Sequence, residues 1–409
     1  MNKTIGIFVD NNLNHDVRVK KQISQYQRLG FDIKVLCFEY HPSDKKNDSI
    51  LPYPIKRIKL SKRLRNGLKI VDGRTNIYGL LLTHWACKFL KSYEVAIFHV
   101  HDLYLSKPCA NAIKKCGSKA HLILDLHENY PEAVTHYGAN KSNLTKWLFN
   151  AKKWKTKEKS FLACTQAIVT LSKSFQDDLQ KKYKELQNHR FVVLPNTLDI
   201  GDFEASQKKE KIKISWKGIN DPTFVYFGVI AKRRGIQLTL KVFRELYEEG
   251  IKVNLLLIGP IDKSEKHEIQ QQMNFLSKKG CLCHVPWINL NDLESYLTLS
   301  DVALSPLEKN KQHESGIANK IFQYMYGSLP IISSDCRPQK DLIQGNDIGS
   351  IFYDLESYKK AILLYLKKET SATMGKKARK LLEEKFDYRS TDFLLKSCLE
   401  SLLSQTPQT

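Results

Sequence analysis

The fold of this chain is decided by the stretch at residues 313–335, which reads HESGIANKIFQYMYGSLPIISSD. A polar loop opens the stretch and meets the N-terminus of a predicted helix. A predicted strand then follows Gly327 and Pro330. This order places the polar loop at the carboxyl edge of a parallel sheet, where open α/β folds bind their ligands.

Short apolar runs that are typical of buried parallel strands recur along the chain. They fall at residues 5–9, 33–38, 96–100, 121–125, 167–171, 191–194, 223–227, 253–258, 302–304 and 330–332. Between the first two runs, apolar residues recur at helical spacing from residue 18 to 29, and Gly30 stops the predicted helix. Strand, helix and strand in this order predict an α/β fold.

The length of 409 residues exceeds one ordinary core and predicts two domains of somewhat under about 200 residues each. Residues 196–221 are polar and Lys-rich without a sustained period, and strand-like runs resume at residue 223. We therefore expect an N-terminal domain at residues 1–200 and a second α/β domain at residues 215–386. The tail from residue 358 onward is helical by pattern.

The charge balance is strongly basic, with 65 lysines and arginines against 43 aspartates and glutamates and a net charge of +22. Such a surface attracts polyanions, whether nucleic acid, anionic lipid or phosphorylated substrates. The sequence has no zinc finger, recognition-helix pattern or RNA-binding sheet signature, so we expect no nucleic acid among its partners. A basic nucleic-acid-binding protein stays open as an alternative.

Targeting and redox signals are few. The first apolar run is too short for a signal peptide, and no segment approaches about 18 apolar residues. We expect a cytoplasmic protein whose membrane contact, if any, is peripheral at the inner face of the membrane. The 9 cysteines are scattered and odd in number, and Cys281 and Cys283 are wrongly spaced for a zinc knuckle, so we expect reduced thiols.

A row of cations, Lys232, Arg233 and Arg234, follows Gly228 at the end of a predicted strand and precedes a helix expected near Ile236. Cations and the free N–H groups of a helix start both suit a diphosphate. From this segment alone, a solvated basic turn in a Lys-rich chain explains the row equally well.

A series of short motifs is similar to family 4 of the retaining GT-B glycosyltransferases, in the subgroup with an "NK-x-F-E-Y-M…G-x-P-V-I" block. The matching segments are HDVRV at 15–19, FHVHD at 98–102, DLHENYP at 125–131, LPNT at 194–197, the glycines and cations at 228–235, and the block at 319–332. The resemblance extends over most of the chain. It implies two Rossmann-like domains facing each other across a cleft, with a last helix at about 387–409 returning to the N-terminal domain.

The resemblance also implies an activity. Members move a sugar from a nucleotide-sugar donor, here onto a saccharide or lipid-linked acceptor, and we expect a role in cell-surface polysaccharide or glycolipid synthesis. No cofactor and no metal are expected, because positive side chains and a helix N-terminus take up the charge of the leaving nucleoside diphosphate. Nucleotide-sugar 2-epimerases share this architecture and remain an alternative, although the "N-K-x-F-x-Y-M" block argues for transfer.

By the same resemblance, the donor belongs to the second domain. Arg234, assisted by Lys232 or Lys320, is expected to hold the diphosphate, and the region near residue 316 is expected to start the helix that faces it. The expected donor-binding residues are Gly228, Lys232, Arg234, Glu314, Ser315, Gly316, Asn319, Lys320 and Gln323.

Three residues of the first domain are the expected catalytic groups. His101 matches the family histidine beside the donor sugar and its developing positive charge, and the alternative is a histidine that merely ends a strand. His127 and Glu128 follow a second strand end, where a carboxylate could orient the acceptor hydroxyl or act as its base. A polar loop that only caps the sheet explains these two residues nearly as well.

Three positions depart from the family pattern. Gln323 stands where the family usually has the glutamate that holds the ribose, and an amide hydrogen-bonds a hydroxyl without charge. Val229 replaces a frequent arginine, and residues 11–14 replace a glycine-rich loop. These changes leave open reduced activity, an unusual donor, or a subgroup with its own solution.

Two basic segments of the first domain suit an anionic membrane surface, with about 1 kcal/mol from each cation near the lipid. They are residues 56–69, with Lys56, Arg57, Lys59, Lys62, Arg63, Arg65 and Lys69, and residues 141–159, where Trp147, Leu148, Phe149 and Trp154 interleave with lysines. An ordinary solvated helix face is the alternative.

Overall fold

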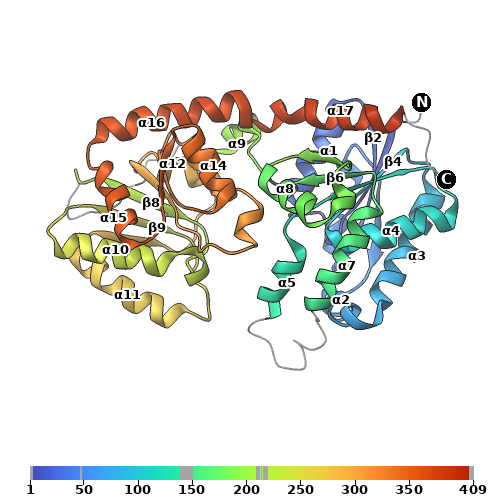
Figure 1. Ribbon diagram of the computed structural model, residues 1–409, viewed down its shortest axis with the longest axis horizontal. Coiled ribbons are helices and arrows are strands. Elements are labelled where there is room, and N and C mark those ends of the chain that lie inside the picture. Colours follow the sequence, from blue (N-terminus) through green and yellow to red (C-terminus); the bar gives the residue numbers. More distant parts are fainter. Residues whose placement is uncertain are drawn as a thin grey trace. The chain divides into compact units, whose positions relative to one another are not determined.

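The computed structural model describes residues 3–46, 48–138, 151–208, 212, 214 and 220–404. The chain divides into two compact units, Met1–Pro195 with Asp392–Thr409, and Asn196–Thr391 (Figure 1). The boundaries expected from the sequence were 200, 215 and about 387. Each unit is a parallel sheet with helices, so the predicted α/β class is confirmed.

In the described residues, the first unit has a seven-stranded parallel sheet of order β3-β2-β1-β4-β5-β6-β7. Its strands are β1 (Thr4–Phe8), β2 (Asp32–Glu39), β3 (Ile55–Lys59), β4 (Ile97–His101), β5 (His121–Asp125), β6 (Ala167–Thr170) and β7 (Arg190–Val193). Its helices are α1 (Val17–Arg28), α2 (Lys62–Thr75), α3 (Ile77–Ser92), α4 (Leu103–Cys116), α5 (Tyr130–Gly138), α7 (Ala151–Ala163), α8 (Lys173–Lys182) and α17 (Asp392–Leu403). Short 3-10 turns are η1 (Pro42–Lys45), η2 (Asp48–Ile50) and η3 (Lys184–Leu186).

The part of the second unit that the structure describes holds a six-stranded parallel sheet of order β10-β9-β8-β11-β12-β13. Its strands are β8 (Thr223–Phe227), β9 (Asn254–Ile258), β10 (Leu282–Val285), β11 (Val302–Ser305), β12 (Ile331–Ser334) and β13 (Gly349–Phe352). Its helices are α9 (Ile200–Ser206), α10 (Ile236–Glu248), α11 (Lys266–Lys279), α12 (Leu293–Leu297), α13 (Asn319–Tyr326), α14 (Arg337–Gly345), α15 (Leu355–Leu364) and α16 (Lys368–Leu381). Short turns are η4 (Lys232–Arg234), η5 (Leu290–Asp292), η6 (His313–Ser315), η7 (Leu382–Phe386) and η8 (Tyr388–Thr391).

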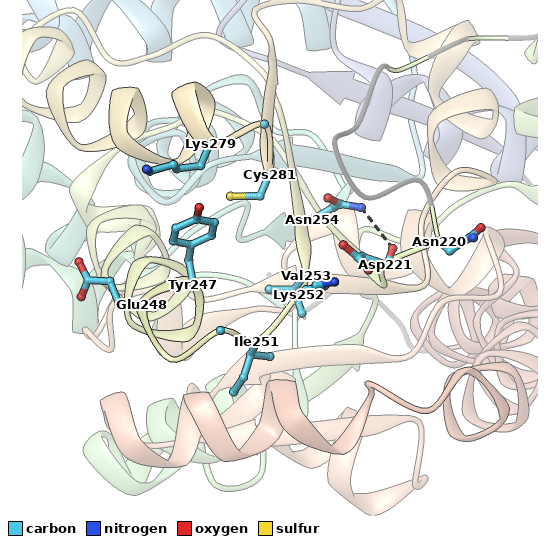
Figure 2. Close-up of a pocket in the computed structure, with 12 residues that line it drawn as sticks. Asn220, Asp221, Tyr247, Glu248, Ile251, Lys252, Val253, Asn254, Lys279 and Cys281 are labelled. Carbon is cyan, nitrogen blue, oxygen red and sulfur yellow. Dashed lines mark hydrogen bonds between the residues drawn. The ribbon is translucent and has the colours of Figure 1, made fainter.

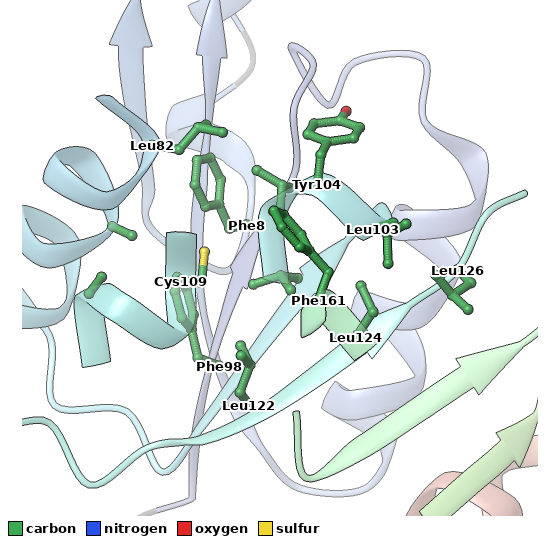
Figure 3. Packing of buried hydrophobic residues seen from close by; sticks show 14 of the residues in the cluster. Phe8, Leu82, Phe98, Leu103, Tyr104, Cys109, Leu122, Leu124, Leu126 and Phe161 are labelled. Atoms are coloured by element: carbon green, nitrogen blue, oxygen red, sulfur yellow. The ribbon is translucent and has the colours of Figure 1, made fainter. Parts of the chain in front are cut away.

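The core of the first unit shows how the strand period divides the residues of β4 between two faces. Phe98 and Val100 join an apolar cluster with side chains from β1, β5, α3, α4 and α7 (Figure 3). Each fully buried apolar side chain in such a cluster contributes about 1.5–3 kcal/mol. Because successive side chains alternate, His99 and His101 lie on the opposite face of the sheet. Two buried histidines therefore occupy a face that the apolar cluster does not cover.

The second sheet has apolar clusters that divide its strand residues between them. In β8, Phe224 and Tyr226 belong to one cluster and Val225 to the other, and β9 divides Leu255 and Leu256 in the same way. Strands buried on both faces are apolar at most positions, which is why the sequence shows them as short apolar runs.

Three strands that the sequence did not predict, β3, β10 and β13, lie at the edges of the two sheets. All of them are less completely buried than the central strands. β3 reads IKRIK and combines three cations with two isoleucines, and edge strands commonly carry such charges. No helix in the described part of the chain is long and apolar enough to cross a membrane.

Candidate functional site

The polar group of the first unit lies where β4 and β5 end. In the parallel register His101 is paired with Asp125, so the two last residues of these strands are neighbours at the carboxyl edge of the sheet. Both side chains are fully buried. The predicted catalytic position of His101 is thus a buried strand end beside a buried carboxylate.

Asp125 is held by α1. Arg18 donates from Nε at 3.2 Å to one carboxylate oxygen of Asp125 and from Nη2 at 2.9 Å to the other, and its third nitrogen, Nη1, donates to the Leu194 carbonyl at 3.1 Å. The Gln22 side-chain amide also donates to Asp125. The forked contact is the geometry that guanidinium and carboxylate groups favour.

Two histidines meet beside this carboxylate. Nδ1 of His101 lies 3.0 Å from Nε2 of His127, and each of these nitrogens is 3.9 Å from an oxygen of Asp125. Nε2 of His101 is buried and has no hydrogen-bond partner among the described residues. The structure therefore brings together His101 and His127, two of the three predicted catalytic residues.

The buried site shifts the pKa values of its groups. Burial lowers the pKa of His99 to about 4 and, together with His99 and His127, lowers the pKa of His101 well below its usual value. Burial alone would raise the pKa of Asp125, but the charges of Arg18 and the histidines outweigh it and lower that pKa. The site thus combines an ionised carboxylate with a neutral His101 near pH 7.

Glu128, the third predicted catalytic residue, lies half-buried between β5 and α5. Burial raises the pKa of Tyr130 well above its usual range, and the carboxylates of Asp102, Asp10 and Glu128 raise it further. Glu128 thus lies close enough to Tyr130 for its charge to act on that phenol. Its position fits a loop carboxylate beside Tyr130.

The backbone around these residues is shaped by unusual turns. Asp102, directly after β4, has a φ of +83°, a conformation that is strained for any residue except glycine. Its carboxylate accepts a hydrogen bond from Tyr104 at 3.0 Å. In the loop after β1, Leu13 also has a positive φ, of +64°, and side chains of the neighbouring asparagines hold the loop in place of the family's glycines.

In the second unit, Lys320 is a buried ammonium at the first turn of α13. Its Nζ lies 3.6 Å from the centre of the Tyr226 ring and has no hydrogen-bond partner in the described residues. A Cβ added to Gly228 would lie 3.5 Å from this Nζ, so the backbone after β8 closely approaches the ammonium. The ring face partly stabilises the cation but leaves its charge unbalanced.

Arg234 lies near Lys320, in the turn η4. Burial lowers the pKa of Lys320 well below its usual value, and the charge of Arg234 lowers it further. Burial also lowers the pKa of Arg234 itself. No carboxylate of the described residues pairs with either cation, whereas the buried guanidiniums of Arg18 and Arg57 each have one. A pair of unbalanced cations at the carboxyl edge of a parallel sheet suits a bound anion.

The remaining predicted donor residues divide by location. Lys232 and Asn319 are exposed, and Gln323 is buried three residues after Lys320 on α13. Oε1 of Glu314 accepts a hydrogen bond from the backbone N–H of Arg337 at 3.0 Å, at the start of α14. The structure therefore brings together Gly228, Arg234 and Lys320 of the predicted donor residues. Glu314 instead accepts a hydrogen bond at the start of α14.

The predicted helix start near Gly316 is wrong, because α13 begins at Asn319. Ser315 ends the short turn η6, and its N–H already donates to the Gln312 carbonyl at 3.2 Å. Gly316 is extended, with a φ of −163°. The helix N-terminus at this edge consequently belongs to Asn319 and Lys320.

One group of described residues has possible metal-ligand atoms within 4.8 Å of one another, namely His99, His101 and Asp125. Nδ1 of His99 already lies 2.7 Å from the Tyr26 hydroxyl. Both oxygens of Asp125 are taken by Arg18 and Gln22. A guanidinium at 2.9 Å from the carboxylate repels a second cation, so the group fits a proton network better than a metal.

The basic segments do not all face solvent. Arg57 pairs with Asp48 at 2.6 Å, and Arg65 with Asp10 at 2.8 Å. The interpretation of Trp154 as a membrane-facing ring is wrong, because it is 2% exposed and packs edge-on against aromatic rings in the core. Residues 141–150, with Trp147, Leu148 and Phe149, lie outside the described residues.

A hollow of about 600 Å³ in the second unit is lined by none of the predicted donor residues (Figure 2). Asn254, Lys279, Cys281 and Tyr247 line it, and they come from the amino ends of strands and the carboxyl ends of the preceding helices. The predicted donor residues, in contrast, follow the carboxyl ends of strands.

The sequence did not identify the roles of Arg18, Gln22, Tyr26, His99 and Asp125. A signal was present, because Arg18, Gln22 and Tyr26 recur every four residues on the helical face that also carries Val19 and Ile23. Polar residues at that spacing on a buried face indicate that the helix holds partners on the sheet.

Two family models match the chain, Glycosyltransferase Family 4 over residues 17–202 and Glycosyl transferases group 1 over residues 207–381. No curated protein matches the chain in sequence.

Solved structures are similar to the whole chain in fold. Sucrose-phosphate synthase from Thermosynechococcus elongatus has a TM-score of 0.71 at 13% identity, over 98% of this chain and 99% of that one. A glycosyltransferase from Rickettsia africae has a TM-score of 0.70 at 13% identity, over 98% and 99%. The Anabaena protein HepE in complex with UDP has a TM-score of 0.67 at 13% identity, over 98% and 100%. Both halves of the sequence match models of glycosyltransferases, and the fold of the two units agrees with them, so the chain belongs to the GT-B glycosyltransferases of family 4, the glycosyl transferases group 1.

Proposed function

We propose that this glycosyltransferase is a retaining enzyme that holds the diphosphate of a nucleotide sugar between Arg234 and Lys320. The observation that carries the proposal is the buried ammonium of Lys320, which has no acceptor among the described residues and lies beside a second cation. A diphosphate would supply the missing negative charge. Gly228, beside this ammonium, has a φ of +135°, a backbone conformation that favours glycine, and a Cβ there would lie 3.5 Å from Nζ of Lys320.

The donor nucleotide is tested by thermal shift with UDP, GDP, ADP, CMP and their sugars, and the true nucleotide raises the melting temperature through binding to the folded state. UDP is the first candidate, because the similar Anabaena protein was solved with it. Arg234→Ala should abolish the shift. Arg244→Ala is the matched control, since Arg244 pairs with Glu248 on the surface of the same unit. An equal shift in both variants would remove Arg234 from the site.

The proposed reaction keeps the configuration of the sugar. The bond between the anomeric carbon and the diphosphate breaks, the acceptor oxygen bonds to the same face, and the acceptor proton leaves with the diphosphate. His101 is neutral, its Nε2 has no hydrogen-bond partner in the described part of the chain, and it is the group proposed to interact with the donor sugar. The anomeric configuration of the product, read by proton NMR, tests retention, and an inverted product would contradict it.

We also propose that the transfer needs no metal, because Arg234 and Lys320 supply the positive charge that a metal supplies elsewhere. Turnover should then be unchanged in EDTA. Restoration of lost turnover by Mg²⁺ or Mn²⁺ would show a metal-dependent transfer.

The acceptor is proposed to be a saccharide or a lipid-linked sugar of a cell-surface polysaccharide or glycolipid, reached at an anionic membrane surface. Lys62, Arg63 and Leu64 support this at the start of α2, where all three are exposed and Leu64 is 54% exposed. Adjacent cations and an exposed leucine suit a lipid surface. An epimerase would instead convert the nucleotide sugar without any acceptor, and incubation of the donor alone separates the two activities.

A further inference from the structure

Helix α1 carries polar side chains on the face that packs against the first sheet. Arg18, Gln22 and Tyr26 are spaced four residues apart and are 5%, 0% and 0% exposed. A buried helix face is normally apolar, since an unpaired buried polar group is costly. Here each of the three side chains has a partner on the sheet, because Arg18 and Gln22 donate to Asp125 and the Tyr26 hydroxyl contacts Nδ1 of His99. Among the described residues, Oε1 of Gln22 has no hydrogen-bond partner.

The carboxylate of Asp125 is surrounded on every side. Arg18 and Gln22 face it from α1, His99 and His101 from β4, and His127 from the loop after β5. Arg18 is the one permanent cation among these groups. Without it, burial would favour the protonated acid.

The histidine pair has one shared proton position. Only one of the two nitrogens, Nδ1 of His101 or Nε2 of His127, can donate across their 3.0 Å contact. If the proton belongs to His101 Nδ1, then Nε2 of neutral His101 offers a lone pair, and otherwise it offers a proton. Asp125 lies 3.9 Å from both nitrogens, so its charge acts directly on this choice.

We infer that Arg18 is a positioning residue that, by holding Asp125 as a carboxylate, fixes the proton between His101 and His127 and thereby the form in which His101 meets its ligand. The inference rests on the proposed function for the identity of that ligand, a donor sugar. It assigns α1, which contributes no group to the histidine pair, to the control of the transfer step.

The test uses the full-length protein, labelled with nitrogen-15 and without substrate, and reads the histidine ring nitrogens by NMR between pH 5 and 8. Arg18→Gln should change the tautomer pattern of His101 and His127. Arg28→Gln is the matched control, because Arg28 lies on the same helix and pairs with Asp392 at 2.8 Å on the surface. The control spectrum should equal that of the unaltered protein.

Kinetics give a second reading. Arg18→Gln should lower kcat about tenfold or more with KM within about twofold, because the change acts on a step after binding. The acid limb of the kcat profile should move to higher pH, since the Asp125 pKa rises once the guanidinium charge is gone. Arg18→Lys keeps the charge and should restore part of kcat.

If Arg18→Gln does not fold, the double variant Arg18→Gln with Asp125→Asn removes both buried charges and should fold. It should still lose the native histidine pattern. Unchanged histidine spectra in a folded Arg18→Gln or double variant would overturn the inference and leave Arg18 a structural ion pair. The spectra need no transfer, so an enzyme that fails to transfer would count against the proposed function alone.

Discussion

Lys320 shows at the scale of one residue how a binding site lowers the stability of the protein that carries it. The ammonium is buried beside Arg234 without a counter-ion among the described residues. A buried cation in this state lowers the free energy of unfolding, because it has lost its hydration and has gained only the face of the Tyr226 ring in exchange. The same unbalanced charge is what a diphosphate would neutralise.

Replacing Lys320 with methionine should therefore separate stability from binding. We expect Lys320→Met to raise the free energy of unfolding by about 1–3 kcal/mol, as replacement of buried charges by apolar side chains often does. It should also abolish nucleoside-diphosphate binding in calorimetry. Lys309→Met is the control, because Lys309 pairs with Asp335 on the surface and should show neither effect. A Lys320→Met protein that binds the nucleotide as well as before would remove Lys320 from the donor site.

His101 allows a contrasting test, because it belongs to the proposed transfer step. His101→Ala should lower kcat by about 100-fold while nucleotide affinity stays within about twofold, as expected for an interaction realised in the transition state. His189→Ala is the control, since His189 lies before β7 and contacts Thr165 at 3.3 Å. Full turnover in His101→Ala would make His101 structural and would direct attention to His127 or Glu128.

At the scale of elements, the packing of α1 on β4 and β5 couples stability to pH. His99, buried on β4, has its pKa lowered from 6.5 to about 4, mainly by burial. Between these two values the unfolded chain binds a proton that the folded chain does not. The free energy of unfolding should thus keep its highest value above pH 6.5, as far as His99 determines it, and fall by about 3 kcal/mol as the pH drops to about 4.

His99→Gln tests this coupling, since an amide can keep the contact with Tyr26 but does not titrate in that range. Chemical denaturation at several pH values should show a smaller loss of stability in the variant between pH 6.5 and 4. Some loss will remain, because the pKa of His101 is lowered as well. An identical pH slope in the two proteins would contradict the assigned pKa of His99.

At the scale of the whole molecule, the net charge of +22 predicts attraction to anionic surfaces. We expect the exposed cations Lys62 and Arg63, at the start of α2, to be a site of contact with such a surface. Lys62→Glu with Arg63→Glu should weaken binding to vesicles of phosphatidylglycerol and phosphatidylcholine by at least about tenfold, from the loss of about 1 kcal/mol per cation. Binding of the unaltered protein should fall steeply with salt.

The matched control for vesicle binding is the pair Lys266→Glu and Lys278→Glu, which makes the same change of net charge on exposed positions of α11. Equal losses in the two double variants would show that total charge, and not the start of α2, governs binding. Binding that is equal on neutral and anionic vesicles, or absent on both, would favour an acceptor that is not held at a membrane.

The sequence by itself determined the central strands, the α/β class and the family. Central strands such as β5 and β9 are buried on both faces, so they stand out in the sequence as short apolar runs. The edge strands β3, β10 and β13 carry no such signal. Each pairs with only one neighbouring strand and is partly exposed to solvent, so polar and apolar residues are both tolerated in it. Likewise, the short motifs identified the family because each depends on a local spacing.

Only the tertiary structure decided which polar residues act together. Arg18 and Asp125 are 107 positions apart in the chain, and nothing in either local sequence shows that one holds the other. Tertiary contacts also bury Trp154 in the core and give Arg57 and Arg65 their carboxylate partners. Strand and helix periods depend on neighbours a few residues away, so the sequence alone could determine the elements. Burial and pairing of polar side chains depend on residues distant in the chain, so only the tertiary structure could determine them.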